Sequence, residues 1–223
     1  MQNSDINALE SMESAVNYNK YIFSKITSVI NTMNIIDFGA GFGYFCDHLA
    51  SNGKKVVAVE TNQEAIRRLK QKNYETHSSL NDIKIRDKTV VSLNVLEHIK
   101  NDQRALDNLY NFMEAGEDLI LYLPVSMSVW SDLDVLVSHY RRYSKQEIIE
   151  KLETSGYSIL SMEYVDFVGW VTLLLMKFFR LQIGFDENKI KFYDRYIFRY
   201  LIFLDKFFLR VIGKNILVVA SKK

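Results

Sequence analysis

The chain has 223 residues, of which 48% are hydrophobic, and a formal net charge of +1 at pH 7. This length and apolar content are enough for a buried core and predict a single domain over residues 1–223. The near-neutral charge gives no support for nucleic acid as a partner. One cysteine, Cys46, excludes an internal disulfide, and no apolar run is long enough to span a bilayer, so we expect a cytoplasmic protein.

The first predicted element is a helix over residues 8–31, within an N-terminal helical segment 1–32. One face of this helix gathers Tyr18, Tyr21, Ile22, Ile26 and Ile30.

Strand-like and helix-like segments then alternate along the chain. The predicted strands are 35–38, 56–60, 89–95, 118–124 and 157–165, and the predicted helices include 63–72, 102–114 and 144–156. Most of these strands are continuous apolar runs, which are typical of parallel strands covered on both faces. The alternation predicts an α/β fold with a Rossmann-like, doubly wound and mostly parallel sheet of about seven strands.

A turn rich in glycine follows the first predicted strand, where residues 35–45 read IIDFGAGFGYF. Glycine lets the backbone turn sharply and lets another group approach it closely. A strand, a glycine turn and a helix N-terminus together favour a site for a nucleotide-like ligand. The dinucleotide fingerprint G-x-G-x-x-G/A fits poorly, because Tyr44 occupies the place of its third small residue.

The pattern D-x-G-x-G-x-G, formed by Asp37 and the three glycines, resembles that of the class I methyltransferases that use S-adenosylmethionine. The resemblance implies that the turn backs the methionine moiety of the cofactor and that Glu60, at the end of the second strand, holds the ribose hydroxyls. The cofactor-binding residues implied around these two points are Asp37, Gly39, Ala40, Gly41, Gly43, Glu60 and Thr61.

Other segments extend this resemblance over nearly the whole chain. SLNVLEHIKND (92–102) is similar to the exit of the fourth strand in many small-molecule methyltransferases, which adds Asn94 and Val95 to the cofactor site. NYNKYIF (17–23) resembles a helix of a bacterial subgroup in which a tyrosine, here Tyr18, closes over the cofactor. The acid that family members commonly place beside the adenine is missing, and Ser79 and Leu80 occupy the corresponding positions.

Two histidines are the candidate catalytic residues. His98 follows the fourth strand, where ligands gather in open α/β sheets, and either removes a proton from the acceptor or forms structural hydrogen bonds with Glu97. His139 belongs to a HYRRYS segment that also marks the bacterial subgroup. The predicted acceptor-binding residues around it are Trp130, Tyr140, Arg141 and Arg142. No metal-ligand spacing appears along the chain, so we expect no metal.

A helical insertion, residues 167–213, precedes the last predicted strand and is rich in aromatic and basic residues. Residues 167–214 contain nine Lys/Arg and four Asp/Glu, a net charge of +5 that leaves −4 for the rest of the chain. Five cations, Lys191, Arg195, Arg199, Lys206 and Arg210, fall on one stripe of a continuous helix. The insertion is either a cap packed on the sheet or a partner, or a basic amphipathic surface, 170–212, for peripheral contact with the inner face of the membrane.

These observations predict a methyltransferase that transfers a methyl group from S-adenosylmethionine to a small-molecule or lipid- or glycan-linked acceptor, with oxygen as the expected atom. The alternatives are an NAD(P)-dependent Rossmann oxidoreductase and a non-catalytic partner protein that binds the cofactor. Methylation of nucleic-acid bases is disfavoured because no proline follows Asn94, and the sequence assigns no oligomeric state.

Overall fold

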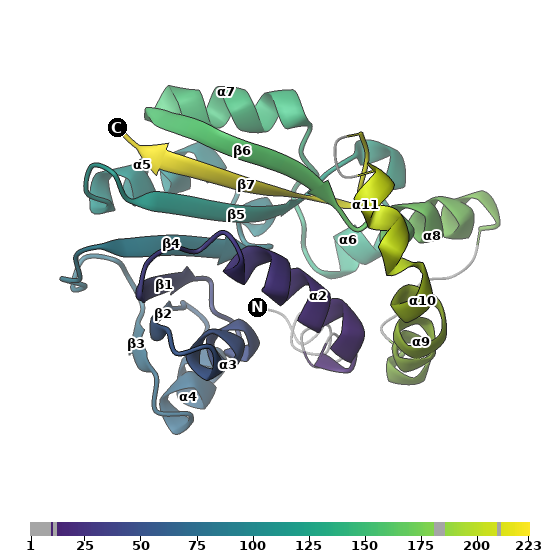
Figure 1. Cartoon of the computed structure of the whole chain (residues 1–223), viewed down its shortest axis with the longest axis horizontal. Helices are drawn as coiled ribbons and strands as arrows, with labels where there is room; N and C mark the ends of the chain where they lie inside the picture. The colour runs from purple at the N-terminus through teal and green to yellow at the C-terminus, as the bar shows by residue number, and fades with distance from the viewer. Residues whose placement is uncertain (1–9, 11–12, 181–185, 209–210) are drawn as a thin grey trace.

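The structure is a computed structural model that describes residue 10 and residues 13–180, 186–208 and 211–223 (Figure 1). Within the described residues, seven strands form one sheet in the order β3-β2-β1-β4-β5-β7-β6. The strands are β1 (Asn34–Phe38), β2 (Lys55–Val59), β3 (Glu75–His77), β4 (Lys88–Leu93), β5 (Asp118–Pro124), β6 (Tyr157–Val165) and β7 (Asn215–Lys222). The first five strands are parallel and β7 is antiparallel to both of its neighbours, which confirms the predicted Rossmann-like, mostly parallel sheet.

Helices cover both faces of this sheet (Figure 1). They are α2 (Val16–Thr27), α3 (Tyr44–Ser51), α4 (Gln63–Gln71), α5 (Asp102–Phe112) and α7 (Lys145–Ser155). Apolar residues of α5 and α7 join one core cluster with the sheet, and those of α2 and α3 join a second cluster on the opposite face. Strands buried from both sides are therefore continuous apolar runs, as the sequence predicted.

The N-terminal helix is shorter than predicted. Helix α2 begins at Val16 and ends at Thr27, whereas the prediction ran from residue 8 to residue 31, and residues 1–9 and 11–12 lie outside the described residues. The predicted face is nevertheless confirmed, since its three isoleucines are buried and its two tyrosines pack against the same core cluster.

The insertion before the last strand is helical, as predicted, but it is not one regular helix. It comprises α8 (Phe167–Phe178), α9 (Glu187–Tyr193), a π-helical turn (Asp194–Phe198), α10 (Arg199–Leu201), a 3-10 turn (Ile202–Leu204) and α11 (Asp205–Phe208). The expected stripe of cations on a continuous helix is therefore wrong in its geometry, because each change of helix type alters the angle between successive residues. Arg210 lies outside the described residues.

Two acidic residues of the insertion face inward and bind the N-termini of other helices. The Asp194 carboxylate accepts hydrogen bonds from the backbone N–H groups of Asn17 (2.9 Å) and Tyr18 (2.8 Å), in the first turn of α2. The Asp205 carboxylate accepts from the N–H groups of Asp166 and Phe167, both 2.8 Å, where α8 begins. A carboxylate satisfies unpaired N–H groups and the positive end of the helix dipole, so these contacts fasten the insertion to the rest of the fold.

The insertion also lies at the edge of the sheet where the parallel strands end. The last residue of β6, Val165, and the last residue of β5, Pro124, both pair with Asn215, the first residue of β7. Figure 1 shows α8 to α11 gathered at this end of the strands, close to α2. The basic and aromatic segment is thus placed beside the edge at which ligands bind in open α/β sheets.

We expect Asp194→Ala to lower the free energy of unfolding by about 1–3 kcal/mol, because it leaves the N–H groups of Asn17 and Tyr18 without their acceptor. Urea denaturation followed by circular dichroism measures this change. The control, Glu187→Ala, removes an exposed acid of the same insertion that pairs with Lys191 across one helical turn. Equal effects of the two substitutions would contradict the capping role of Asp194.

Candidate active site

The glycine turn lies between β1 and α3 with its three glycines in left-handed conformations. The φ angles of Gly39, Gly41 and Gly43 are 84°, 53° and 81°, values that side chains with a Cβ seldom adopt. A Cβ added to Gly39 would lie 2.3 Å from Cγ2 of Val95, so the turn after β4 packs directly against the turn after β1. Glycine at position 39 is therefore required by this close approach as well as by its backbone conformation.

Glu60, immediately after β2, is held against the glycine turn. Its Oε2 accepts a hydrogen bond from the N–H of Gly41 at 2.9 Å. Its Oε1 accepts from the N–H groups of Thr61 (2.7 Å) and Asn62 (2.8 Å), at the start of α4. The carboxylate thus joins the ends of two neighbouring strands and is fixed in orientation by three backbone donors.

Asp37 lies in β1, where its side chain is buried and faces α3. The Cys46 thiol donates to Oδ2 of Asp37 at 3.2 Å. The pKa of the Asp37 carboxyl is raised to about 7, chiefly by burial and to a smaller extent by the negative charge of Glu60, while the Cys46 hydrogen bond opposes the rise. Asp37 therefore supports the turn from within the fold, and its predicted contact with the cofactor stays a prediction.

The remaining residues predicted to bind the cofactor follow the ends of the strands. Ala40 is buried in the glycine turn. Asn94 has a φ of 50° and accepts a hydrogen bond on Oδ1 from Nδ2 of Asn215 at 3.2 Å. After β3, the Ser79 hydroxyl accepts from the N–H of Asn81 at 3.1 Å, and Leu80 packs against the main core cluster. Because parallel strands end at one edge of the sheet, these residues share that edge with Glu60.

Tyr18, the predicted cofactor-closing residue, lies in the first turn of α2. Its hydroxyl is 3.3 Å from that of Tyr122, in β5, and Nζ of Lys214 lies 4.7 Å from the centroid of its ring. Lys214 in turn pairs with Asp166 at 2.8 Å. Tyr18 is thus held at the junction of α2, the insertion and the central strands.

The structure brings the two predicted catalytic histidines together. His98 ends a 3-10 turn (Leu96–His98) after β4, and His139 follows the short helix α6 (Asp132–Leu136). Their ring centroids are 4.6 Å apart. His139 is oriented by Asp134, whose Oδ1 lies 2.9 Å from Nδ1 of the ring.

Two acids of this cluster, Glu97 and Asp134, were not assigned site roles from the sequence. Glu97 is fully buried, and neither of its carboxylate oxygens has a hydrogen-bond partner among the residues that the structure describes. Burial raises the pKa of Glu97 to about 8. Nε2 of His139 lies 3.8 Å from Oε1 of Glu97. The LEH motif contained the signal for Glu97, whereas only the fold places Asp134 against His139.

Two of the predicted acceptor-binding residues are engaged within the protein instead. Arg142 is buried, and its Nε lies 2.8 Å from Oδ1 of Asp134. Arg141 lies 2.7 Å from the carboxylate of Asp102 and donates to the carbonyl of Lys100 at 2.9 Å. Each guanidinium already has a carboxylate partner, so the structure does not favour the expected clamp for an acidic acceptor.

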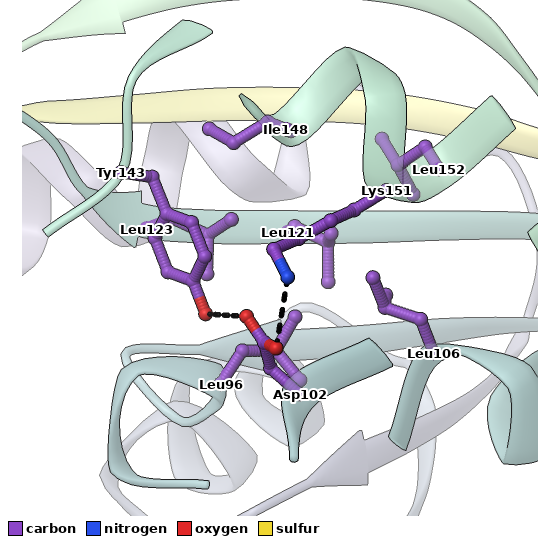
Figure 2. Close-up of a pocket in the computed structure, with 9 residues that line it drawn as sticks. All are labelled: Leu96, Asp102, Leu106, Leu121, Leu123, Tyr143, Ile148, Lys151 and Leu152. Atoms are coloured by element: carbon purple, nitrogen blue, oxygen red, sulfur yellow. Dashed lines mark hydrogen bonds and ion pairs between the residues drawn. The ribbon is translucent and has the colours of Figure 1, made fainter. Parts of the chain in front are cut away.

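The carboxylate of Asp102 holds the HYRRYS segment through Tyr143, and Figure 2 shows these two side chains with the hydrogen bond between them. It accepts hydrogen bonds from the Tyr143 hydroxyl at 2.9 Å and from Nζ of Lys151 at 3.0 Å. The neighbouring cavity is lined mainly by leucines and is barely large enough for one water. This cluster is therefore a support for the loop and not a binding site for a cofactor.

The other predicted acceptor-binding residues remain more accessible. Tyr140 is 57% exposed, and its backbone N–H donates to the carbonyl of Glu97 at 2.8 Å. Trp130 is half-buried at the end of a 3-10 turn (Met127–Val129). Its predicted contact with the acceptor, like that of Tyr140, stays a prediction.

The strand order, with a reversed seventh strand, and the glycine turn beside Glu60 define a Rossmann-like fold of the methyltransferase class. Residues 18–162 match the family described as "Methyltransferase domain", and the chain therefore belongs to this family. This membership confirms the enzyme class and the cofactor, S-adenosylmethionine, that were predicted from the sequence.

Two curated relatives match most of the chain at low identity. A ribosomal RNA small subunit methyltransferase A from Mycoplasmopsis synoviae (strain 53) is 24% identical over 73% of this chain, which spans only 60% of that relative. A ubiquinone biosynthesis O-methyltransferase from Rickettsia canadensis (strain McKiel) is 28% identical over 65% of this chain and 72% of its own length.

A solved structure with the cofactor has the same fold. Magnesium protoporphyrin IX methyltransferase from Synechocystis PCC 6803, with S-adenosylmethionine bound, superposes with a TM-score of 0.56 at 12% identity. The match covers 97% of this chain and 84% of the other. At this level of identity the likeness concerns the fold.

The raised pKa of Asp37 predicts a pH-dependent stability. The folded chain keeps the Asp37 proton up to about pH 7, whereas the unfolded chain releases it near 3.8, so the stabilising contribution of the proton is lost as pH rises between these values. We expect the free energy of unfolding of Asp37→Asn, relative to the unsubstituted protein, to increase by about 2–3 kcal/mol from pH 5 to pH 8. Chemical denaturation across this range measures the difference. Asp82→Asn, at an exposed acid, is the control, and a pH-independent difference for Asp37→Asn would contradict the shift.

Proposed function

We propose that this chain transfers the methyl group of S-adenosylmethionine to a hydroxyl oxygen of a small-molecule or lipid- or glycan-linked acceptor. The observation that carries the proposal is the glycine turn locked to the Glu60 carboxylate at the carboxyl ends of β1 and β2. The relative named as an O-methyltransferase supports oxygen as the acceptor atom. We also infer that residues 1–223 act as one domain, because β7, which follows the insertion, lies between β5 and β6.

Glu60 is the residue most suited to hold the adenosyl group. A carboxylate offers about four acceptor positions, of which the three backbone donors use three. One position is left for a ribose hydroxyl, and a second hydroxyl replaces one of the backbone donors. The bare backbone of Gly39 to Gly43 adjoins this carboxylate and allows the close approach of the cofactor. The sulfonium supplies a methyl group that is already activated for transfer.

His98 and His139 are the residues that we assign to proton removal from the acceptor. Imidazole gains and loses a proton near neutral pH, which suits a general base. His98 is exposed just beyond Asn94 and Val95, and His139 beside it is oriented by Asp134. Trp130 and Tyr140, on the same loop as His139, are placed to contact the acceptor.

Several observations distinguish this proposal from its alternatives. An NAD(P)-dependent oxidoreductase would need a small residue where Tyr44 stands, and the match to the methyltransferase family speaks against it. A non-catalytic partner would need only the cofactor site, whereas this chain also pairs two histidines beside it. RNA as the acceptor has the support of one relative's name, but the near-neutral charge and the absence of proline after Asn94 oppose it.

The test of this function is calorimetric titration with S-adenosylmethionine. We expect saturable binding to the unsubstituted chain, and at least tenfold weaker binding to Glu60→Gln, because the amide replaces one acceptor oxygen by a donor. Glu64→Gln, at an acid of α4 that pairs with Arg67 and Arg68, is the matched control and is expected to bind normally. Heat from NADH in place of S-adenosylmethionine would favour the oxidoreductase instead.

We further propose that the insertion brings the enzyme to an anionic lipid surface. Its two buried acids, Asp194 and Asp205, are occupied with helix N-termini, so the outer face is left mainly to cations and aromatic rings. The exposed aromatic residues are Phe178, Phe179, Phe192, Tyr196, Tyr200, Phe203 and Phe207. Within the described residues, no helix has the length and apolar character needed to cross a bilayer. Rings together with cations suit binding at the surface of a membrane.

The lipid surface is tested by co-sedimentation with vesicles that contain an anionic lipid. We expect the unsubstituted chain to sediment with anionic vesicles and Phe203→Glu/Phe207→Glu to lose most of this binding, because both rings are exposed and the new charges are repelled. Deleting residues 170–212 is a poorer test, since it removes most of α8 together with Asp194, which caps α2. Leu160→Glu, an exposed apolar residue of β6, is the control. Binding of neither protein to anionic vesicles would leave the insertion as a packing element.

A further inference from the structure

We propose that Glu97, His98 and His139 bind a divalent transition-metal ion that also holds the acceptor oxygen. The methyl-transfer part of this inference rests on the proposed function, whereas metal binding by these residues does not. One ligand atom from each residue lies within 4.8 Å of the others, and no metal-ligand spacing was visible along the chain because His139 comes from a separate loop. The prediction of no metal rested on the spacing of possible ligands along the chain, which does not show ligands from separate segments.

The buried carboxylate of Glu97 is the observation that points to a cation. A buried carboxyl group without a hydrogen-bond partner is unfavourable, and buried carboxylates are normally paired or bound to a metal. Glu97 is completely buried, its two carboxylate oxygens have no hydrogen-bond partner within the described part of the chain, and Oε1 is directed toward the ring of His139. A dication at this point would satisfy the carboxylate.

His139 has the arrangement that metal-binding histidines usually show. Its Nδ1 is paired with Asp134, so the other nitrogen, Nε2, faces Glu97. Asp134 is itself fixed by Arg142 at 2.8 Å and by the N–H of Ser131 at 3.0 Å. Arg142 is buried and thus positions the carboxylate of Asp134, which in turn orients His139.

Metal binding requires only a small movement of the three ligand atoms toward one another. Zinc-like ions bind nitrogen and oxygen at about 2.0–2.2 Å, which brings ligand atoms to about 3–3.5 Å from one another. The ligand atoms must therefore approach by about 1–2 Å from their present spacing, and the side chain of His98 is exposed to solvent. Two imidazoles and one carboxylate favour zinc, manganese, iron(II) or cobalt over magnesium and calcium.

Such an ion has open coordination positions for the acceptor. A hydroxyl bound to it loses its proton more easily, and that proton passes to solvent water. The acceptor oxygen then forms its bond to the methyl carbon while the electron pair of the broken S–C bond stays on sulfur. Under this arrangement the histidines hold the metal, and the metal replaces a free imidazole as the means of removing the proton.

Cobalt(II) is the probe, because its visible absorption reports the ligands around it. Protein without a histidine tag is stripped with EDTA, dialysed and titrated with Co²⁺. We expect one saturable site per chain in the unsubstituted protein. Glu97→Gln and His139→Gln should each weaken binding by more than about tenfold, since even the partners of metal ligands are worth ~10–100-fold.

The matched control is Glu75→Gln. It removes a carboxylate that lies 2.9 Å from another histidine, His77, where the described residues supply no third ligand, and it should leave Co²⁺ binding unchanged. Circular dichroism checks that Glu97→Gln is folded, and His98→Gln, at an exposed position, provides a second test that does not disturb the core. The metal site would be overturned if the unsubstituted protein showed no saturable Co²⁺ binding. It would also be overturned if the Glu97, His98 and His139 variants bound Co²⁺ as tightly as the unsubstituted protein does.

Calorimetry with S-adenosylmethionine on the stripped protein separates this inference from the proposed function. Cofactor binding without cobalt binding would refute the metal site and leave the methyltransferase proposal in place. Cobalt binding without cofactor binding would support the metal site and contradict the methyltransferase proposal. Where both bind, faster methyl transfer on adding Zn²⁺ or Mn²⁺ to the stripped enzyme supports the role in transfer, and a rate that does not depend on metal contradicts it.

Discussion

The contact between Val95 and the bare backbone of Gly39 joins the two strand ends on which the candidate site depends. A side chain at position 39 would collide with Val95, so the turns after β1 and β4 can pack together only while that position is glycine. This packing places the residues that follow β4, from Asn94 to His98, beside the turn proposed to hold the cofactor. Glu60 completes the arrangement because it ties the same turn to the end of β2.

Carboxylates that are paired with backbone N–H groups or with arginines hold the insertion and the HYRRYS segment in place. Asp194 and Asp205 fasten the insertion to two helix N-termini, and Asp102 and Asp134 hold the HYRRYS segment through Arg141 and Arg142. Buried acids are costly unless they are paired, so each of these contacts fixes its segment in one position. Glu97 is the exception, since its buried carboxylate has no hydrogen-bond partner among the described residues.

The same contacts explain which side chains of the insertion face the fold and which face solvent. A helix that packs through apolar residues would turn its rings inward. Here the inward contacts include two acids and Phe198, and the rings of Phe203 and Phe207 are exposed. The surface beside the site is consequently both basic and aromatic, which connects the architecture of the insertion to the proposed lipid-linked acceptor.

The sequence by itself determined the mostly parallel sheet, because continuous apolar runs are local properties of the chain. The glycine spacing and Glu60 are local as well, and they carried the resemblance that implied the class of enzyme and the cofactor. Strand β5 and strand β6 have the predicted bounds, since apolar runs ended by proline, glycine or an acid mark strands clearly. Tertiary structure alone decided the partners of Arg141 and Arg142, the inward direction of Asp194 and the meeting of Glu97, His98 and His139. These contacts join segments far apart in the chain, and no local pattern records which distant group a buried charge will face.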